Sequence, residues 1–257
     1  TDMRVFMALV RRELGAYFNS LTGYVVIAAV LLLTGFGLVD LIERIRQMPY
    51  PSPVTELFYQ TTYFWLVVLL TSPVITMRSF AAEKAAGTYE ALMTTPVGDW
   101  QVVLAKFGAA YALYTTLWGS TVVFFWVLRR FSGDERFLDS GPLLGGYLFI
   151  AVSGLLFVAL GVLASSLTRN QSVAGILGCV ALATLILGGN ALADSTWLAQ
   201  GALEPLRPAV QYAHVFGHRD DFARGVIDLR HVLFYLSGSA LALIFSILGV
   251  EAKLLHA

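Results

Sequence analysis

YVVIAAVLLLTGFGLV, residues 24–39, contains no charged side chain and decides the fold class. The uncharged run extends further, over residues 14–39. An α-helix needs about 20 residues to cross a hydrocarbon core of about 30 Å, so this run is long enough. A membrane β-barrel would instead show segments of about 10 residues in which apolar and polar side chains alternate. The continuous apolar pattern therefore predicts a membrane-spanning helix.

The same pattern recurs along the rest of the chain. Hydrophobic residues make up 57% of the 257 residues and charged residues only 13%, about half the share of roughly 25% in globular proteins. The further runs without Asp, Glu, Lys or Arg are 57–77, 107–128, 140–168, 170–193 and 231–250. We therefore predict an all-α integral membrane protein, a single domain over residues 1–257. Its six transmembrane helices are expected at about 21–42, 57–77, 105–128, 143–167, 171–192 and 232–250.

Several classes of function have no support in the sequence. The net charge of 0 does not favour nucleic-acid binding, and the lone Cys179 excludes a disulfide within the chain. No phosphate-binding G-x-x-x-x-G-K-[ST] motif and no H-E-x-x-H or G-x-S-x-G motif occurs, so we expect no catalytic residue, no cofactor and no enzyme activity. His214 and His218, followed by Asp220 and Asp221, have a spacing that can bind a metal. Gly217 interrupts that helix, so a surface loop is favoured over a metal site.

The orientation in the membrane is not decided by the basic residues. An even number of spans places both termini on one side, and the 17 Lys and Arg residues then divide 8 and 9 between the two sides. Residues 3–18 form a basic amphipathic helix with an apolar stripe, which is typical of a helix lying on the anionic cytoplasmic leaflet. We therefore expect both termini in the cytoplasm. The alternative is a soluble cap that packs on the bundle.

A polar stretch, RSFAAEKAAGTYEALMTTP, separates the second and third predicted spans. Its Ala and Glu residues favour a helix over 78–96, and Pro96 ends it. Glu83, Gly87 and Glu90 would then share one face. Such a helix can show its polar side to a partner, or it can be an ordinary solvated loop helix, and the pattern leaves both open.

The surrounding sequence, residues 72–107, resembles the ABC-2-type permeases of ABC transporters. The matching positions are Pro73, the TMR at 76–78, Glu83, Gly87-Thr88, Glu90, the TTP that ends at Pro96, and Lys106. A second stretch, ARGVIDLRHVLFYLS at 223–237, also matches. Together they are similar to the gliding-motility-associated permease subgroup.

The resemblance implies how the chain would work. Such permeases pair as homodimers or heterodimers in the bacterial cytoplasmic (inner) membrane, and each copy binds an ABC ATPase subunit that holds ATP and magnesium. Residues 78–96 would be the coupling helix that docks on the ATPase, beside the interfacial helix 3–18. The coupling residues would be Arg78, Glu83, Lys84, Gly87, Thr88, Glu90 and Pro96. Pro73 would be a hinge in the second span, and residues 193–231 would form short re-entrant or surface helices outside.

The expected function is that of the permease subunit of an ATP-binding cassette exporter. Two other functions stay open at this point. One is an ABC-type membrane scaffold or mechanotransducer without a transported substrate. The other is an ion-coupled carrier, which the absence of Asp, Glu, Lys and Arg inside the spans disfavours.

Overall fold

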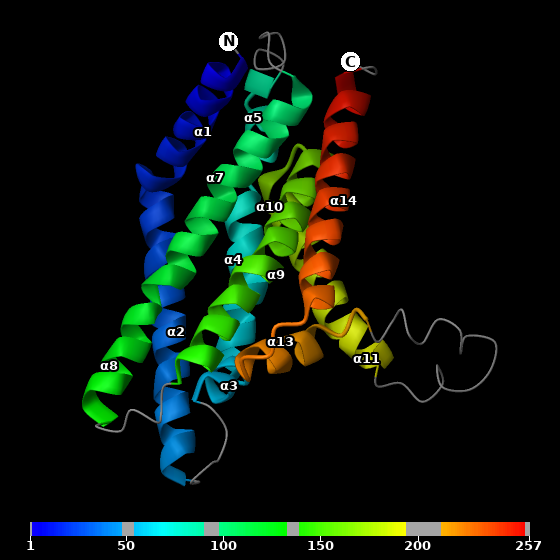
Figure 1. Ribbon diagram of the computed structural model, residues 1–257. Helices are drawn as coiled ribbons and strands as arrows, with labels where there is room; N and C mark the ends of the chain where they lie inside the picture. The colour runs from blue at the N-terminus through cyan, green and yellow to red at the C-terminus, as the bar shows by residue number, and fades with distance from the viewer. Residues whose placement is uncertain (1, 48–53, 90–97, 133–138, 194–211, 255–257) are drawn as a thin grey trace, which may run out of the picture.

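The computed structural model describes residues 2–47, 54–89, 98–132, 139–193 and 212–254. Every regular element in these residues is a helix, as Figure 1 shows, which confirms the all-helical prediction for this part of the chain. In chain order the elements are α1 (Asp2–Phe18), α2 (Leu21–Gln47), α3 (Val54–Tyr59), α4 (Thr62–Thr76), α5 (Ala81–Ala85), α7 (Asp99–Ser120), α8 (Val122–Ser132), α9 (Ser140–Leu167), α10 (Gln171–Ala183), a π-helical turn (Thr184–Gly188), α11 (Gly189–Ala193), α13 (Val215–Ala223) and α14 (Leu229–Leu254).

Within the described residues, five helical stretches are long and apolar enough to cross a membrane. They are Gly23–Arg46, Asp99–Arg130, Ser140–Leu167, Gln171–Leu192 and Leu229–Glu251. Each contains most or all of one of the predicted spans. The protein is therefore a multi-pass membrane protein.

The predicted span 57–77 is divided between α3 and α4. Thr61 ends the first helix and caps the second, because its hydroxyl donates to the Phe58 carbonyl at 2.7 Å and accepts from the Phe64 N–H at 3.3 Å. The apolar helix α4 has 15 residues, a rise of about 22 Å, which is short of the length that a full crossing needs. The prediction of one continuous helix here was wrong, because it took no account of the capping threonine.

The middle of the bundle is α9, whose glycines let its neighbours approach closely. A Cβ on Gly154 would lie 2.2 Å from the Tyr114 ring of α7, and a Cβ on Gly161 would lie 2.1 Å from the Thr76 hydroxyl of α4. Such distances are far below van der Waals contact, so both positions require glycine. They bring α4 and α7 against the same central helix.

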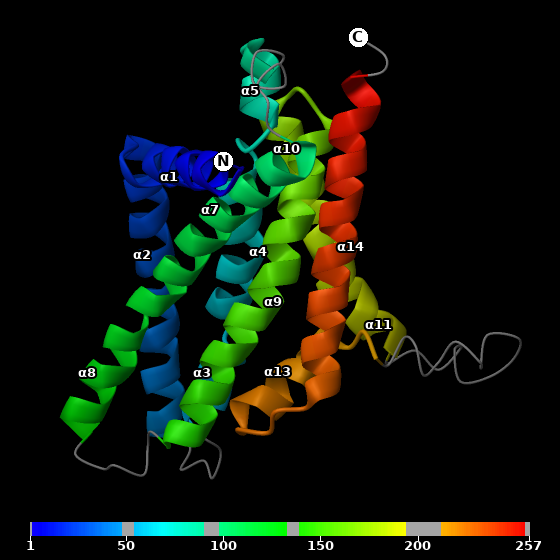
Figure 2. The ribbon, with the colours of Figure 1, turned by 45° about the horizontal axis from the view of Figure 1, so that its top comes forward.

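The connecting elements gather at two opposite ends of the bundle. One end holds α1, α5 and the C-terminal end of α14, and the other holds α3, α13 and the C-terminal end of α8 (Figure 1). Helix α1 lies across its end of the bundle, over α7 (Figure 2). A helix therefore occupies the segment 3–18, as the sequence predicts, and Met3 and Met7 on it are exposed.

The end with α13 is held by polar contacts. Arg224 pairs with Glu56 of α3 at 3.2 Å, and Arg219 donates to the Tyr59 carbonyl at 3.2 Å. Helix α13 lies in the predicted surface segment 193–231, of which residues 194–211 lie outside the described part. The described residues contain no cluster of three metal-ligating side chains. His218 instead contacts the Tyr235 hydroxyl at 3.2 Å.

Candidate coupling site at the α1–α5–α7 junction

The helix in the polar segment after α4 is shorter than the predicted helix over 78–96. Helix α5 covers only Ala81–Ala85, and Ala86 and Gly87 form a turn. Gly87 has a φ of 70°, in the left-handed region that favours glycine. The prediction of one continuous helix through Glu83 and Gly87 was therefore wrong, because the backbone at Gly87 has a left-handed conformation. A Cβ there would meet nothing within 4 Å, so within this chain it is the turn, and no close contact, that favours glycine at this position.

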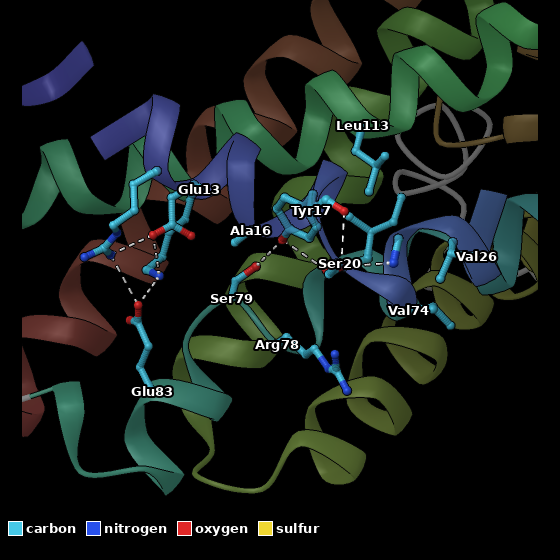
Figure 3. Close-up of a pocket in the computed structure, with 14 residues that line it drawn as sticks. Glu13, Ala16, Tyr17, Ser20, Val26, Val74, Arg78, Ser79, Glu83 and Leu113 are labelled. Atoms are coloured by element: carbon cyan, nitrogen blue, oxygen red, sulfur yellow. Dashed lines mark hydrogen bonds and ion pairs between the residues drawn. The ribbon is translucent and has the colours of Figure 1, made fainter. Parts of the chain in front are cut away.

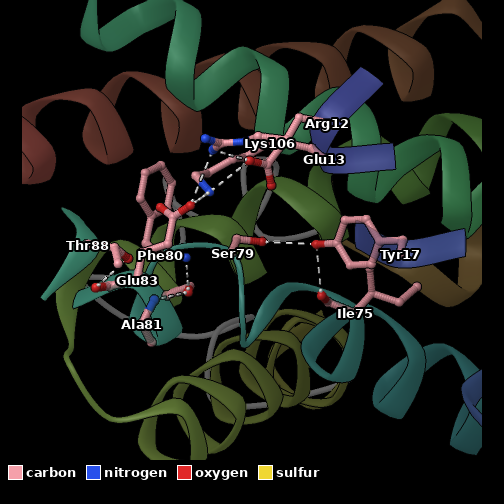
Figure 4. A network of polar contacts seen from close by, with 11 residues as sticks. Arg12, Glu13, Tyr17, Ile75, Ser79, Phe80, Ala81, Glu83, Thr88 and Lys106 are labelled. Atoms are coloured by element: carbon pink, nitrogen blue, oxygen red, sulfur yellow. Dashed lines mark hydrogen bonds and ion pairs between the residues drawn. The ribbon is translucent and has the colours of Figure 1, made fainter. Parts of the chain in front are cut away.

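Glu83 of α5 points into the molecule, toward Glu13 of α1 (Figure 3) and Lys106 of α7 (Figure 4). The Lys106 Nζ lies 2.8 Å from Glu83 Oε1 and 3.3 Å from Glu13 Oε1. Arg12 pairs with the same two oxygens, at 2.7 Å for Glu13 and 3.4 Å for Glu83. Two cations and two carboxylates thus form one cluster that joins α1, α5 and α7. We call these four residues the junction cluster.

Burial makes the junction cluster energetically important. The Lys106 side chain is only 2% exposed, and its Nζ lies 5.3 Å from the centre of the Phe80 ring. A buried charge is tolerated only when it is paired, and removing one partner of a buried pair costs about 3–5 kcal/mol. The cluster therefore holds the three segments in one relative position, because separating them would leave Lys106 buried and unpaired.

The N-terminal end of α5 is bound to α9 through the side chain of Ser165. The Ser165 hydroxyl accepts from the Phe80 N–H at 3.0 Å and the Ala81 N–H at 3.1 Å, and it donates to the Met77 carbonyl at 3.3 Å. These two N–H groups are at the start of α5, where a helix has no internal acceptors. Phe80 supplies no side-chain cap of its own. The Ser165 side chain, which belongs to α9, therefore caps the N-terminus of α5.

Lys84 attaches the same helix to α9 a second time. Its side chain is buried and its Nζ donates to the Ser166 carbonyl, close to the C-terminal end of α9. Its Nζ also lies 5.0 Å from the centre of the Tyr89 ring. A cation at the carbonyl end of a helix is favourable. The predicted coupling residues Glu83 and Lys84 are thus both turned toward the protein's own helices.

A tyrosine ties α1 to the end of α4. The Tyr17 hydroxyl donates to the Ile75 carbonyl at 3.1 Å and lies 3.3 Å from the Ser79 hydroxyl (Figure 4). Burial raises the pKa of Tyr17 to about 12, so the hydroxyl keeps its proton at neutral pH. The Tyr17 hydroxyl therefore remains a hydrogen-bond donor to the Ile75 carbonyl over the physiological pH range.

The remaining predicted residues have different environments. Arg78, Gly87 and Thr88 are exposed, and with Ala85 and Ala86 they form the outer surface of the segment. Glu90 and Pro96 lie outside the described residues. The exposed residues Ala85–Thr88 have small side chains. Glu83 is turned inward to Lys106, so it does not share their exposed face, as the predicted helix had placed it with Gly87.

Pro73, the predicted hinge, lies in the last turn of α4 and packs on α10. A Cβ on Gly178 would lie 3.2 Å from its Cβ. Because proline has no N–H, it leaves the Leu69 carbonyl without its helical donor. The Cys179 thiol lies 3.9 Å from that carbonyl. Whether the helix bends at Pro73 during function stays a prediction.

Sequence reasoning missed Arg12, Glu13, Tyr17 and Ser165 as parts of this site. One signal was present: Glu13 is the only acidic residue in the segment 3–18, next to two arginines. No local pattern marks Ser165, which is one of several serines in apolar runs. Its role depends on where α9 ends relative to α5.

Comparison with protein-family models identifies a family for this chain. The family model of the ABC-2 family transporter proteins matches residues 15–250, which is nearly the whole chain. A search of curated proteins found no match. Of the described residues, the matched region includes α4, the segment after it and the five long apolar stretches, the last of them up to one residue before its end. This chain therefore belongs to the ABC-2 family of transporter membrane proteins.

Proposed function

We propose that this chain is the membrane subunit of an ATP-driven exporter. In this proposal a separate ATPase holds the ATP and magnesium, and this subunit supplies the path and no chemistry. The observation that carries the proposal is the junction cluster, which connects a short surface helix to a long membrane helix through a buried lysine. Membership of the ABC-2 family supports it.

The exposed residues Ala85–Thr88 are the docking surface in this proposal. Small side chains let a partner's surface approach the backbone closely. Movement of α5 would reach α7 through Glu83 and Lys106, and it would reach α9 through Ser165 and Lys84. Both routes run through buried polar contacts, which resist separation more than exposed ones do. A push on α5 would therefore move the two helices together.

The proposed topology has six passes, with α3 and α4 together making the second. The N-terminal helix α1 and the end of α14 lie at the same end of the bundle as α5 (Figures 1 and 2), which supports an even number of passes. We place that end in the cytoplasm of a bacterial cell, where the ATPase would be, and α3 and α13 on the outer side. Two copies, or this chain and a related permease, would complete the path.

Purification from native membranes tests docking. Tagged protein should bring down an ATPase subunit, and Ala86→Trp should abolish this, because a bulky ring would stand on the exposed docking surface. Ala191→Trp is the matched control, since Ala191 is exposed on α11 away from that surface. Equal ATPase recovery with both variants would contradict the docking surface. A chain that transports alone in liposomes would contradict the proposal as a whole.

A second experiment tests transmission. Leu144 is exposed near the start of α9, at the end opposite to α5. A cysteine placed there, in a Cys179→Ser background, should change its reactivity with a membrane-impermeant thiol reagent when ATP and magnesium reach the complex. Glu83→Gln should keep ATPase binding and lose that change. If binding and the change both persist, force does not pass through the junction cluster. If the change is absent in the parent as well, the subunit acts as a scaffold.

A further inference from the structure

A cavity of about 440 Å³ lies beside the junction cluster, between α1, α2, α4 and α7. Its volume is within the range of about 300–1,000 Å³ that is usual for small-molecule sites. Figure 3 shows Glu13 and Glu83 at one end of it, Tyr17 and Ser79 in the middle, and Val26 and Val74 at the other end. The cavity thus has one charged end and one apolar end.

The charged side chains of the whole lining are more often positive than negative. Arg12, Lys106 and Arg78 line the cavity, against the carboxylates Glu13 and Glu83, and Arg78 lies apart from both carboxylates, on the Val74 side of Ser79 (Figure 3). Both carboxylates have an oxygen engaged in the junction cluster. Arg78 is exposed at the rim. An anionic group entering from the surface would therefore meet a net positive charge.

The start of α2 adds to this preference. Ser20 lies at its N-terminus, accepting from the Gly23 N–H at 3.1 Å and donating to the Tyr17 carbonyl at 3.2 Å. Ser20 and Gly23 both line the cavity. The N-terminal end of a helix carries a partial positive charge, which favours an anion nearby. The chain turn between α1 and α2 thus presents the same sign of charge as Arg78.

The apolar part of the lining leads toward the lipid. Val26 and Val74 are half-buried, and the neighbouring side chains Tyr24 and Val25 on α2 are 60% and 58% exposed. In a membrane protein such a face contacts acyl chains. Helix α1 crosses the bundle at this level (Figure 2). A molecule bound here would have its polar group beside α1 and its apolar part along α2.

We propose that this cavity binds one anionic phospholipid of the leaflet in which α1 lies. Its phosphate is next to Arg78 and the start of α2, and one acyl chain enters between Val26 and Val74. A soluble anion would use only the charged end and would leave the apolar end empty. This inference rests on the membrane location and the cavity, and it does not depend on the proposed ATPase.

Native mass spectrometry of the detergent-purified chain tests the proposal, with dioleoyl-phosphatidylglycerol and dioleoyl-phosphatidylcholine as probes. We expect phosphatidylglycerol to bind at least about fivefold more tightly, with one lipid retained per chain. Arg78→Gln should remove about that fivefold preference, and Val74→Trp should abolish retention by filling the apolar end. Arg4→Gln is the matched control, because Arg4 is exposed on α1 and does not line the cavity.

Three outcomes would overturn the proposal. The first is equal retention of the two lipids. The second is an equal effect of Arg78→Gln and Arg4→Gln, which would show a general attraction of the basic surface. The third is displacement of the lipid by inorganic phosphate at millimolar concentration, which would show a site for free phosphate groups. Because Val74→Trp could disturb folding, the exposed Arg78→Gln variant carries the decision, with thermal unfolding as its check.

Discussion

At the end of the bundle that holds α1 and α5, Lys106 is 2% exposed between carboxylates from two different segments. At the end that holds α3 and α13, the charges are reversed: Arg224 is 61% exposed and pairs with Glu56, whose side chain is 7% exposed. The first arrangement joins three elements through one buried cation. The second joins two elements through a single pair whose cation is exposed, so that water screens it. The comparison indicates that α1, α5 and α7 are held together more firmly than α3 and α13 are.

The largest expected effect comes from removing the buried cation. Lys106→Met leaves Glu13 and Glu83 facing each other with only Arg12 beside them. We expect a loss of about 3 kcal/mol in the free energy of unfolding, or roughly 6–12 °C in Tm. Thermal unfolding in detergent measures it. Glu56→Gln is the matched removal of the buried member at the other end, and it should shift Tm less, because it leaves only the exposed Arg224 without its partner. Equal shifts would remove the distinction between the two ends.

The next effect concerns the serine that caps α5 from α9. Ser165→Ala leaves the N–H groups of Phe80 and Ala81 buried without their acceptor. We expect a cost of about 1–3 kcal/mol, with faster hydrogen exchange of these two amides. Ser153→Ala, in the same helix, is the control, since Ser153 bonds only within its own helix, to the Ile150 carbonyl at 3.5 Å. If Ser153→Ala lowers the stability as much as Ser165→Ala does, the contacts of Ser165 with α5 do not account for the loss.

At the α13 end, pH should act through His218. Burial, and then the charge of His231, lower the pKa of His218 from 6.5 to about 4. His231 and Tyr235 face it from α14, and Asp228 and His214 also influence it. Because the folded state disfavours the charged imidazole, its contribution to stability is complete above pH 6.5 and is lost as the pH falls toward 4.

The measurement is Tm between pH 7 and pH 4. We expect Tm of the wild type to fall more steeply than that of His218→Phe, which keeps an aromatic ring and cannot titrate. The difference between the two curves isolates the titration of His218, together with its interaction with His231, from the groups elsewhere in the protein. Parallel curves would show that protonation of His218 does not weaken this end of the bundle.

The smallest effect distinguishes turn geometry from packing at the α5 end. Gly87→Ala should cost about 1 kcal/mol, because φ is positive there although space is open. Gly108→Ala in α7 also enters open space but has no positive φ, so it should stabilise by up to about 1 kcal/mol. Opposite signs in thermal unfolding would support the turn. A stabilising Gly87→Ala would contradict it.

The long apolar helices were predictable because lipid imposes a local rule. A segment such as 231–250 must be continuously apolar to be stable in a bilayer, and that property can be read from neighbouring residues alone. The helix over 3–18 follows in the same way from its periodic stripe. The split of 57–77 at Thr61 was not predicted. A threonine can sit inside a helix or cap one, and only its contacts with Phe58 and Phe64 decide between the two.

The sequence by itself determined the class of the protein, most of its membrane helices and the position of the polar segment after α4. The tertiary structure alone decided which way that segment faces. Glu83 and Lys84 have the same local pattern whether they point to solvent or inward. Their direction is set by Lys106, Glu13 and the end of α9, which are distant in sequence. A charged side chain pairs with an opposite charge that lies close in space, and the folded chain determines which residues are close.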